Sequence, residues 1–383
     1  MEIIMLLSLG MILIGFILLT YGADLLVKGA GRLALLVGIS PLVVGLTVVA
    51  FGTSAPEAAV SLKSALIGKV GITVGNVVGS NIFNTFVVLG VASLIAPLVV
   101  HAQVIRKEVP LLVGASFLLL VLSLDGVISR WDGVLLFVLI VAYTWWSIHS
   151  SRRESSDVSD EYGQRFGEEH DHSIPDEVPG LKQTGPKAVF VNLFLLCIGV
   201  GMLIFGSNVL VNGAVAIAEL FGVSDLIIGL TIVSIGTSLP ELATSIMAGI
   251  RGERDIAVGN AVGSSLFNIL AVLGLSGLAS PSGVPVASST LHVDLPVMIF
   301  SALACLPVFL TSHKISRGEG VAFVLYYCIY IAYLILDAAA SPHLFLFIRL
   351  VLYIVVPLTV IFAAYLLIKG IRQHRRGEYT LKR

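Results

Sequence analysis

The sequence predicts an all-α polytopic membrane protein, built from two inverted five-helix repeats and an extra C-terminal transmembrane helix. Three observations carry this prediction. The 383-residue chain is 57% hydrophobic and only 12% charged, whereas a soluble domain carries about a quarter charged residues. Long apolar runs recur along the whole chain. One segment of 46 residues occurs twice.

Eleven apolar runs are long enough to cross the hydrocarbon core of a bilayer. They cover residues 4–26, 38–62, 71–98, 108–125, 132–149, 188–212, 222–249, 256–279, 293–312, 318–337 and 344–369. The first run lacks a basic leader and a small-residue cleavage site, so we interpret it as a retained span. Cys197, Cys305 and Cys328 fall inside apolar runs, and we expect them to be small core residues rather than disulfide or metal ligands.

The chain divides into four parts. Residues 1–149 form the first repeat, 150–187 a cytoplasmic acidic linker, 188–338 the second repeat, and 339–383 an extra transmembrane helix with a basic cytoplasmic tail. We interpret the linker as a solvated connection, and the alternative is a regulatory cation site around His170, Asp171 and His172. The net charge of −1 gives no basic field that would attract nucleic acid.

Positive charge predicts the orientation, because Lys and Arg accumulate in cytoplasmic loops. If the N-terminus is outside, all but four of the 23 Lys and Arg residues are cytoplasmic, and the exceptions are Lys63, Lys69, Arg130 and Arg349. We therefore expect a multi-pass protein of the cell (inner or plasma) membrane with its N-terminus outside and its C-terminus in the cytoplasm.

The repeated segment spans residues 45–90 and 229–274. The two copies align at a constant offset of 184 without a gap, and 24 of the 46 positions are identical. The first copy begins in the second span and the other in the seventh, so five spans separate them. An odd number means that the copies cross the membrane in opposite directions, and such repeats hold a substrate site near the midplane.

Each copy carries a Gly-Thr-Ser-X-Pro-Glu motif near the middle of an apolar span. The motifs are residues 52–57 and 236–241. Proline interrupts a helix and frees backbone carbonyls, which survive at membrane depth only where protein or a polar cavity satisfies them. The glutamate that follows lies in the first turn of the second half-helix, where the helix dipole favours a carboxylate. An ionisable residue inside the membrane indicates a functional site.

The spans that follow add a polar stripe. Asn76, Ser80 and Asn84 recur every fourth residue and therefore share one helix face, and the second copy repeats them as Asn260, Ser264 and Asn268. Two glutamates supply a charge that matches one Ca²⁺, and carboxylate, hydroxyl and carbonyl oxygens are the ligands that Ca²⁺ and Na⁺ prefer. The pattern predicts a small-cation site.

The two segments resemble the α-repeats of the calcium/cation antiporter superfamily, especially its sodium/calcium exchanger-like bacterial and archaeal members. The resemblance implies ten core helices with the site where spans two, three, seven and eight cross, and it implies that Glu57 and Glu241 hold Ca²⁺ or Na⁺ in turn. The other ligands that it implies are carbonyl, hydroxyl or amide groups of Ala50, Thr53, Ser54, Ser80, Asn84, Ser234, Thr237, Ser238, Ser264, Ser265 and Asn268. Some relatives carry aspartate at the place of Asn268.

The expected function is secondary active antiport of Ca²⁺ for Na⁺ by alternating access, without a cofactor, an enzymatic activity or an obligatory protein partner. Ca²⁺ and Na⁺ are then substrates, and the bilayer is the medium. A proton-coupled Ca²⁺ antiporter is the alternative, but that branch has GNxxE in the third span, where this chain has Gly79 as the last residue of the pattern. A channel fits inverted repeats with broken helices less well, and a hydrolase using Ser54 or Glu57 would lack a His or Lys partner.

Two further interpretations concern the first and sixth spans. We expect both to be flexible at Gly22 and Gly206 and able to slide to open either side. Asp24 has Asn208 as its counterpart in the other repeat, and we interpret it as a helix-end charge near the cytoplasm.

Overall fold

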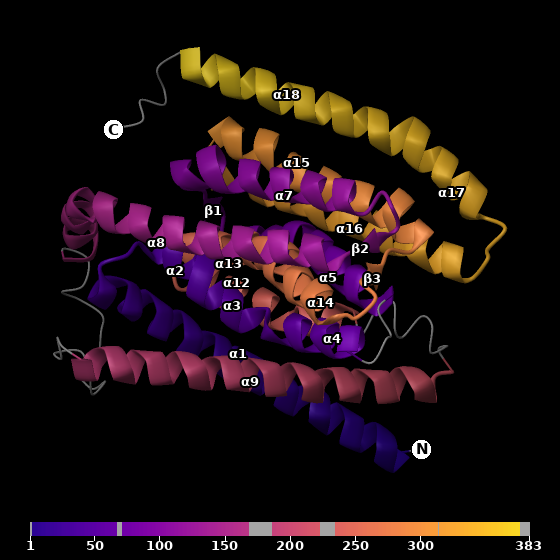
Figure 1. The fold of residues 1–383 in the computed structure, drawn as a ribbon, viewed down its shortest axis with the longest axis horizontal. Helices are drawn as coiled ribbons and strands as arrows, with labels where there is room; N and C mark the ends of the chain where they lie inside the picture. Colours follow the sequence, from indigo (N-terminus) through magenta and orange to yellow (C-terminus); the bar gives the residue numbers. More distant parts are fainter. Residues whose placement is uncertain (1, 67–70, 168–185, 223–233, 313, 376–383) are drawn as a thin grey trace.

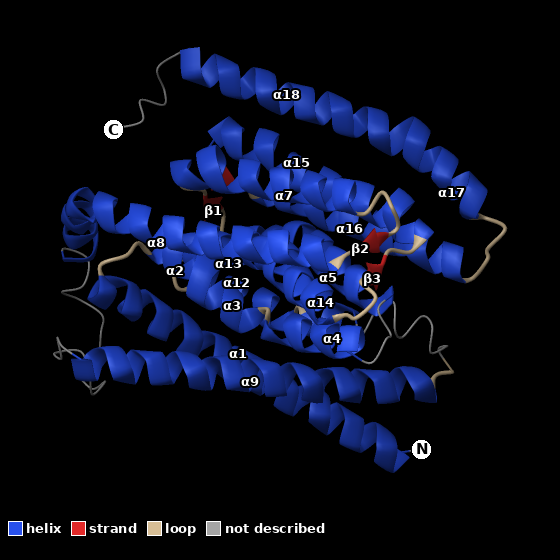
Figure 2. Cartoon of the chain, viewed as in Figure 1, coloured by secondary structure: helices blue, strands red, loops and turns tan. Residues whose placement is uncertain are grey.

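The computed structural model describes residues 2–66, 71–167, 186–222, 234–312 and 314–375. These residues are helical almost throughout (Figure 2), and their short strands form two small sheets. The long helices run roughly parallel or antiparallel to one another, as expected for a bundle that crosses a membrane (Figure 1).

The first repeat contains five spans. They are α1 (Glu2–Val37); α2 (Pro41–Val44), η1 (Gly45–Val49), α3 (Ala50–Thr53) and α4 (Ala55–Leu66); α5 (Gly71–Phe83), η2 (Asn84–Val88) and α6 (Leu89–Ile95); η3 (Val104–Glu108) and α7 (Val109–Leu122); and α8 (Arg130–Gly167). The segments named η are π-helical turns, which are rare and concentrate at functional sites.

The second repeat follows the same order. Its described elements are α9 (Pro186–Leu220); α11 (Ser234–Thr237) and α12 (Leu239–Ile250); α13 (Arg254–Phe267), η6 (Asn268–Val272) and α14 (Leu273–Ala279); η7 (Thr290–Asp294) and α15 (Leu295–Ser312); and α16 (Arg317–Ala338). The extra segment is α17 (Leu344–Leu350), η8 (Val351–Val355) and α18 (Val356–Arg375).

Most of the predicted spans are found as continuous helices. Among the described residues, eight helices are long and apolar enough to cross a membrane, and a ninth span is the pair Pro41–Thr53 and Ala55–Leu66, which is bent by 48°. The predicted span 108–125 is displaced by a few residues, because η3 and α7 together run from Val104 to Leu122. The predicted span 222–249 lies partly outside the described residues, and its described part is α11 and α12.

The predicted linker begins as a helix, because α8 continues to Gly167. The alternative cation site around His170, Asp171 and His172 lies outside the described residues. The predicted linker range therefore contains a helical extension of the fifth span at its start.

Two small antiparallel sheets join the repeats at opposite ends of the bundle (Figure 1). In one, β1 (Leu98–Val99) pairs with β4 (Lys314–Ile315), and in the other β2 (Val127–Ile128) pairs with β3 (Val284–Pro285). Each sheet connects two loops that the predicted span order assigns to the same membrane face. The pairing is therefore consistent with the alternation of spans expected for an inverted repeat.

Helices α1 and α9 pack side by side along one flank of the bundle (Figure 1). A Cβ at Gly22 would lie 3.0 Å from the Gly199 carbonyl oxygen, and one at Gly206 would lie 2.8 Å from Leu18 Cβ. Both helices run unbroken through these positions. The glycines allow close helix contact, the usual role of small residues in membrane packing, and sliding at these positions stays a prediction.

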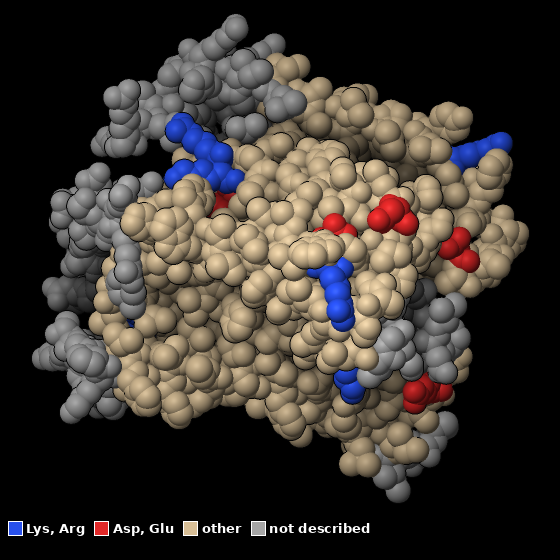
Figure 3. Space-filling model, in the orientation of Figure 1, with Lys and Arg blue, Asp and Glu red and all other residues tan. Residues whose placement is uncertain are grey.

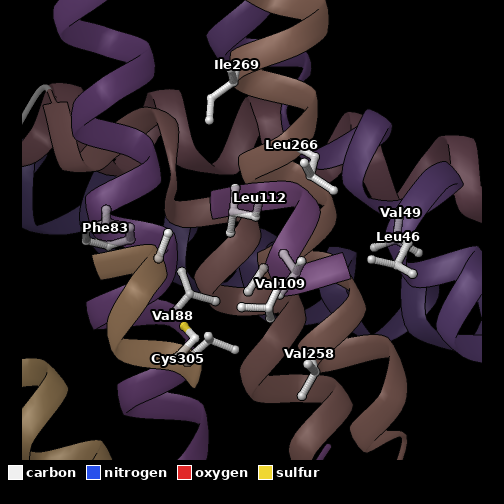
Figure 4. Close-up of a cluster of buried hydrophobic side chains, with 14 of the residues drawn as sticks. Leu46, Val49, Phe83, Val88, Val109, Leu112, Val258, Leu266, Ile269 and Cys305 are labelled. Atoms are coloured by element: carbon white, nitrogen blue, oxygen red, sulfur yellow. The ribbon is translucent and has the colours of Figure 1, made fainter. Parts of the chain in front are cut away.

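The core is shared between the repeats. Figure 4 shows part of one buried cluster, to which Phe83 and Val88 of the third span and Val258 and Leu266 of the eighth all belong. The face shown in Figure 3 carries a broad uncharged band between charged groups, as a lipid-facing surface should. Cys305 is buried, but Cys197 and Cys328 are exposed. The core assignment is wrong for these two, because apolar residues of a span also face lipid.

Candidate cation site

The site is built on two broken helices. The chain leaves the helical conformation at Ser54, between α3 and α4, where φ is −81° and ψ is 8°. Ser238 does the same between α11 and α12, with φ −93° and ψ 7°. Pro56 and Pro240 follow within the first two residues of the next helix, where a missing N–H costs nothing. Sequence identity in the two motifs thus produces the same local break twice.

Glu57 and Glu241 lie in the first turn after each break, and both are completely buried. Each carboxylate accepts a hydrogen bond from the serine of the other repeat. Ser54 Oγ donates to Glu241 Oε1 at 3.0 Å, and Ser238 Oγ donates to Glu57 Oε1 at 2.9 Å. Ser80 Oγ lies 3.5 Å from the same Glu57 oxygen. The crossed bonds bring the two predicted glutamates into one cluster, although they are far apart in sequence.

One oxygen of each glutamate has no hydrogen-bond partner. Glu57 Oε2 and Glu241 Oε2 are buried and unbonded, and so are the side-chain oxygen and nitrogen of Asn84 and of Asn268. A buried polar group without a partner is costly, and carboxylates are the most costly of these. The unbonded oxygens of these four side chains are therefore available to coordinate a cation.

Asn84 and Asn268 are each the first residue of a π-helical turn, η2 and η6. A π-turn shifts the register of the helix that follows it and re-aims the side chains around it. The same distortion at the same position in both repeats indicates that it belongs to the site and is not an accident of packing.

Two asparagines hold the glutamate backbone. Asn76 Nδ2 lies 3.4 Å from the Glu57 carbonyl oxygen, and Asn260 Nδ2 lies 3.2 Å from that of Glu241. Each amide also donates to a buried serine, Ser61 or Ser245, at 3.0 Å. The polar stripe in the sequence includes Asn76 and Asn260 but not Ser61 and Ser245. A signal for them exists in the sequence, since Ser61 and Ser245 are identical positions of the aligned repeats.

The hydroxyl groups among the remaining predicted ligands lie around this centre. Ser80 Oγ lies 3.1 Å from Ser238 Oγ. Thr53 Oγ1 donates to Asn260 Oδ1 at 3.0 Å and lies 3.3 Å from Ser264 Oγ. Four of these five residues are fully buried and Ser80 nearly so. Their contacts join the second, third, seventh and eighth spans in one polar network.

Four predicted ligands are less directly involved. Ser265 Oγ donates to the Ala261 carbonyl of its own helix at 2.9 Å, and the Ala50 carbonyl accepts from Ser54 N at 3.0 Å. Thr237 is half-buried, one residue before the break, and Ser234 begins α11. These four residues stay predicted ligands beside the unbonded oxygens of the central side chains.

The network contains oxygen and amide groups and lacks a cationic partner among the described hydrogen bonds and ion pairs of these side chains. Within the described residues, no three or more His, Cys, Asp or Glu side chains lie together so that they could hold a metal ion. The arrangement suits a hard cation held by two carboxylates and neutral oxygens.

Comparison with known proteins likewise indicates a protein that handles small cations. A family model described as sodium/calcium exchanger protein matches residues 7–149 and 191–336. The chain is 36% identical over 321 residues to the inner membrane protein YrbG of Escherichia coli, covering 83% of this chain and 93% of that protein. It is 30% identical over 307 residues to the sodium/calcium exchanger MaX1 of Methanosarcina acetivorans, covering 74% and 85%.

A solved structure of the sodium-calcium exchanger NCX_Mj matches with a TM-score of 0.70 at 31% identity, covering 86% of this chain and 99% of that one. The family match ends at residue 336, before the eleventh span. From its duplicated motifs, its helical membrane fold and these relationships, the chain is a member of the sodium/calcium exchanger family of multi-pass membrane transporters.

Proposed function

We propose that the protein exchanges Ca²⁺ for Na⁺ across the cell membrane. The observation that supports this most is the pair of buried glutamates, each hydrogen-bonded by the serine of the opposite repeat and each keeping one unbonded oxygen. Related proteins bear the name sodium/calcium exchanger. The central ligands of the proposal are Glu57, Glu241, Asn84 and Asn268, with Ala50, Thr53, Ser54, Ser80, Ser234, Thr237, Ser238, Ser264 and Ser265 around them.

The charge of the site explains exchange. Two ionised glutamates carry −2, which one Ca²⁺ or two Na⁺ neutralise. An empty pair of buried carboxylates is costly in a low-dielectric interior, so the unloaded protein changes conformation slowly. Ca²⁺ and Na⁺ then move in opposite directions, because each must occupy the same carboxylates before the site can turn to the other face.

Sodium suits this site better than a proton as the coupling ion. Ser80, Thr53 and Ser264 surround the glutamates with neutral oxygens, and Na⁺ is coordinated by such oxygens, whereas a proton needs only one titrating base. Gly79 occupies the position at which the proton-coupled pattern has a glutamate in the third span. The proton-coupled alternative remains the competing outcome of the experiment below.

We propose that the N-terminus is outside and that the C-terminus is cytoplasmic. The distribution of Lys and Arg supports this orientation. In this orientation the α1–α9 pair is the mobile element. Its two helices contact each other through glycines, and the pair lies over the flank of α12. The pair can shift along its length to uncover one side of the site.

The test is Ca²⁺ uptake into proteoliposomes. Vesicles containing the purified protein are loaded with Na⁺, or made acidic inside by an equal gradient of H⁺, and external Ca²⁺ is then added. Uptake driven by Na⁺ alone supports sodium exchange. Uptake driven by H⁺ alone would identify the protein as a proton-coupled antiporter. Uptake that depends on neither gradient would contradict antiport. Mn²⁺ added in competition reports whether another divalent ion is the preferred substrate.

A further inference from the structure

A cavity of about 170 Å³ lies between the ninth, tenth and eleventh spans. Its walls are residues of α15, α16 and α18, including Ala304, Phe323 and Ala363. The family match ends before α17 and α18, so this cavity exists only because the extra span covers the family core. Nothing in the proposed cation pathway uses it.

The chemistry of the lining selects an apolar occupant. Only three lining side chains are polar: Glu319, Tyr326 and Thr359. The Tyr326 and Thr359 hydroxyls are 2.8 Å apart, and Thr359 also donates to the Val355 carbonyl. Glu319 Oε2 accepts from the backbone and side chain of Ser316 in a capping box. Each of these side chains thus has a hydrogen-bond partner within the protein, and a cavity with such walls favours hydrocarbon over water.

The position of the cavity favours a lipid acyl chain as its occupant. Two walls of the cavity are α16 and the eleventh span. Only 6% and 0% of the residues in their membrane-crossing stretches are buried, so the surroundings of the cavity are bilayer. From Glu319 to Tyr326 the cavity follows α16 for seven residues, which is about 10 Å of helix. That length runs from the end of the bundle into the hydrocarbon region, the direction in which an acyl chain lies.

Positive charge near the Glu319 end of the cavity favours an anionic headgroup. Lys314 and Arg317 are exposed directly before Glu319, and the sequence at the end of α18 carries Lys369, Arg372 and Arg375. Basic residues next to a span attract anionic lipids. In the proposed orientation this end faces the cytoplasm, so the lipid belongs to the cytoplasmic leaflet.

The cavity is connected to the cation site through aromatic rings. Phe300, Phe323 and Tyr326 line the cavity, and they surround Phe86 with centroid distances of 6.0, 5.7 and 5.6 Å. Phe86 lies in η2, the π-turn that begins with Asn84. The other repeat has Leu270 at this position. Only one of the two site asparagines is therefore supported by this aromatic cluster.

We propose that this cavity binds one acyl chain of an anionic phospholipid and that its occupancy tunes the cation site through Phe86 and Asn84. The binding stands on the cavity alone, whereas the regulation rests on the proposed exchange activity. Filling the cavity should therefore remove lipid and lipid sensitivity together, without removing exchange itself.

The chain offers a matched pair of variants. Ala363 lines the cavity, and the neighbouring Ala364 is exposed toward lipid. Native mass spectrometry of protein extracted from membranes containing phosphatidylglycerol should detect one retained phosphatidylglycerol on the wild type and on Ala364→Phe, and none on Ala363→Phe. Equal retention by both variants, or no retention by the wild type, would overturn the binding.

The regulation is tested by exchange in liposomes of phosphatidylcholine with and without phosphatidylglycerol. Wild type and Ala364→Phe should change their apparent Ca²⁺ affinity by about fivefold or more, and Ala363→Phe should not respond. An equal response in both variants contradicts the regulation. If no chain transports Ca²⁺, the proposed function fails while the lipid result stands. Should Ala363→Phe not fold, Lys314→Gln with Arg317→Gln replaces it, with loss of phosphatidylglycerol preference as the expected result and an unchanged preference as the contradicting one.

Discussion

The two repeats share a motif but not an environment. In the second repeat, α1 packs against α12, and Thr244 is completely buried. The equivalent residue of the first repeat, Val60 on α4, is 38% exposed. For an antiporter this inequality is informative, because only one side of the site can be open at a time. Two halves with the same sequence pattern must therefore adopt unequal conformations.

A second inequality is electrostatic. Asp24 of α1 forms ion pairs with Lys28, at 2.8 Å, and with Arg251, which follows α12. The equivalent positions in the other repeat are Asn208, Asn212 and Ile67, which have no charge. The prediction of a helix-end charge at Asp24 is wrong, because α1 continues to Val37. Asp24 instead ties α1 to the second repeat through Arg251, and this ion pair stabilises the arrangement in which α1 covers α12.

The centre of the site also departs from symmetry. Ser238 bonds both Glu57 and Ser80, whereas Ser54 bonds Glu241, and Ser264 instead lies against Thr53. The two carboxylates are thus held by different sets of neighbours. The following predictions either remove the shared features of the repeats or equalise the unequal ones.

The largest effect is expected for Glu57→Gln and Glu241→Gln. Each change removes one of the two negative charges, so the site no longer neutralises the charge of Ca²⁺. Exchange should therefore fall below detection in proteoliposome uptake. Glu108→Gln is the matched control, because Glu108 is equally buried but bonds Tyr143 and Gln103 outside the site. Full transport by either site variant would contradict the assignment of the carboxylates.

An intermediate effect is expected for Ser54→Ala and Ser238→Ala. A hydrogen bond to a charged group contributes about 1.5 to 3 kcal/mol, so the apparent Ca²⁺ affinity should fall by about 10 to 100-fold. Ser238→Ala should be the more severe, since it loses two contacts. Ser116→Ala controls for loss of a buried hydroxyl, because Ser116 bonds only its own helix. Equal affinities for the two site variants would mean that the centre is symmetric.

A smaller effect is expected for Asp24→Asn, which makes the first repeat resemble the second. The ion pair is partly exposed, so its contribution is about 1 kcal/mol or less, and the balance between the two conformations should shift by up to about fivefold. The measurement is apparent Ca²⁺ affinity in inside-out and right-side-out vesicles, which should change in opposite directions. Arg251→Gln should act likewise and should not add to Asp24→Asn. Additive effects would show that the two side chains act separately.

The smallest effect on transport, with an effect on stability instead, is expected for two tyrosines. Tyr143 donates to Glu108 at 2.6 Å, and Tyr330 donates to Asp294 at 3.0 Å. Each carboxylate is the last residue of a π-turn before a span, so the contacts are equivalent in the two repeats. Tyr143→Phe should cost about 1 to 3 kcal/mol, measured by thermal unfolding in detergent. Tyr330→Phe should cost less, because Asp294 is only half-buried. A larger loss for Tyr330→Phe would contradict this order.

The sequence by itself determined the membrane fold, the duplication and the candidate residues of the site. Hydrophobic runs identify spans because lipid requires apolar surfaces, and the identical motifs at a constant offset identify Glu57 and Glu241 as a pair. The repeated polar stripe indicates Asn84 and Asn268 for the same reason. A duplicated pattern indicates a functional site rather than packing alone, because a buried glutamate after a proline rarely occurs twice by chance.

Tertiary structure alone decided which atoms meet. The crossed Ser54–Glu241 and Ser238–Glu57 bonds join residues more than 180 positions apart, and no local pattern records such a pairing. Gly22 and Gly206 are points of close contact between α1 and α9, because a partner helix lies against each of them. The cover of α1 over α12 and the cavity beside α18 also depend on how finished helices pack. Those choices depend on shape and distance in three dimensions, which periodicity along one chain does not contain.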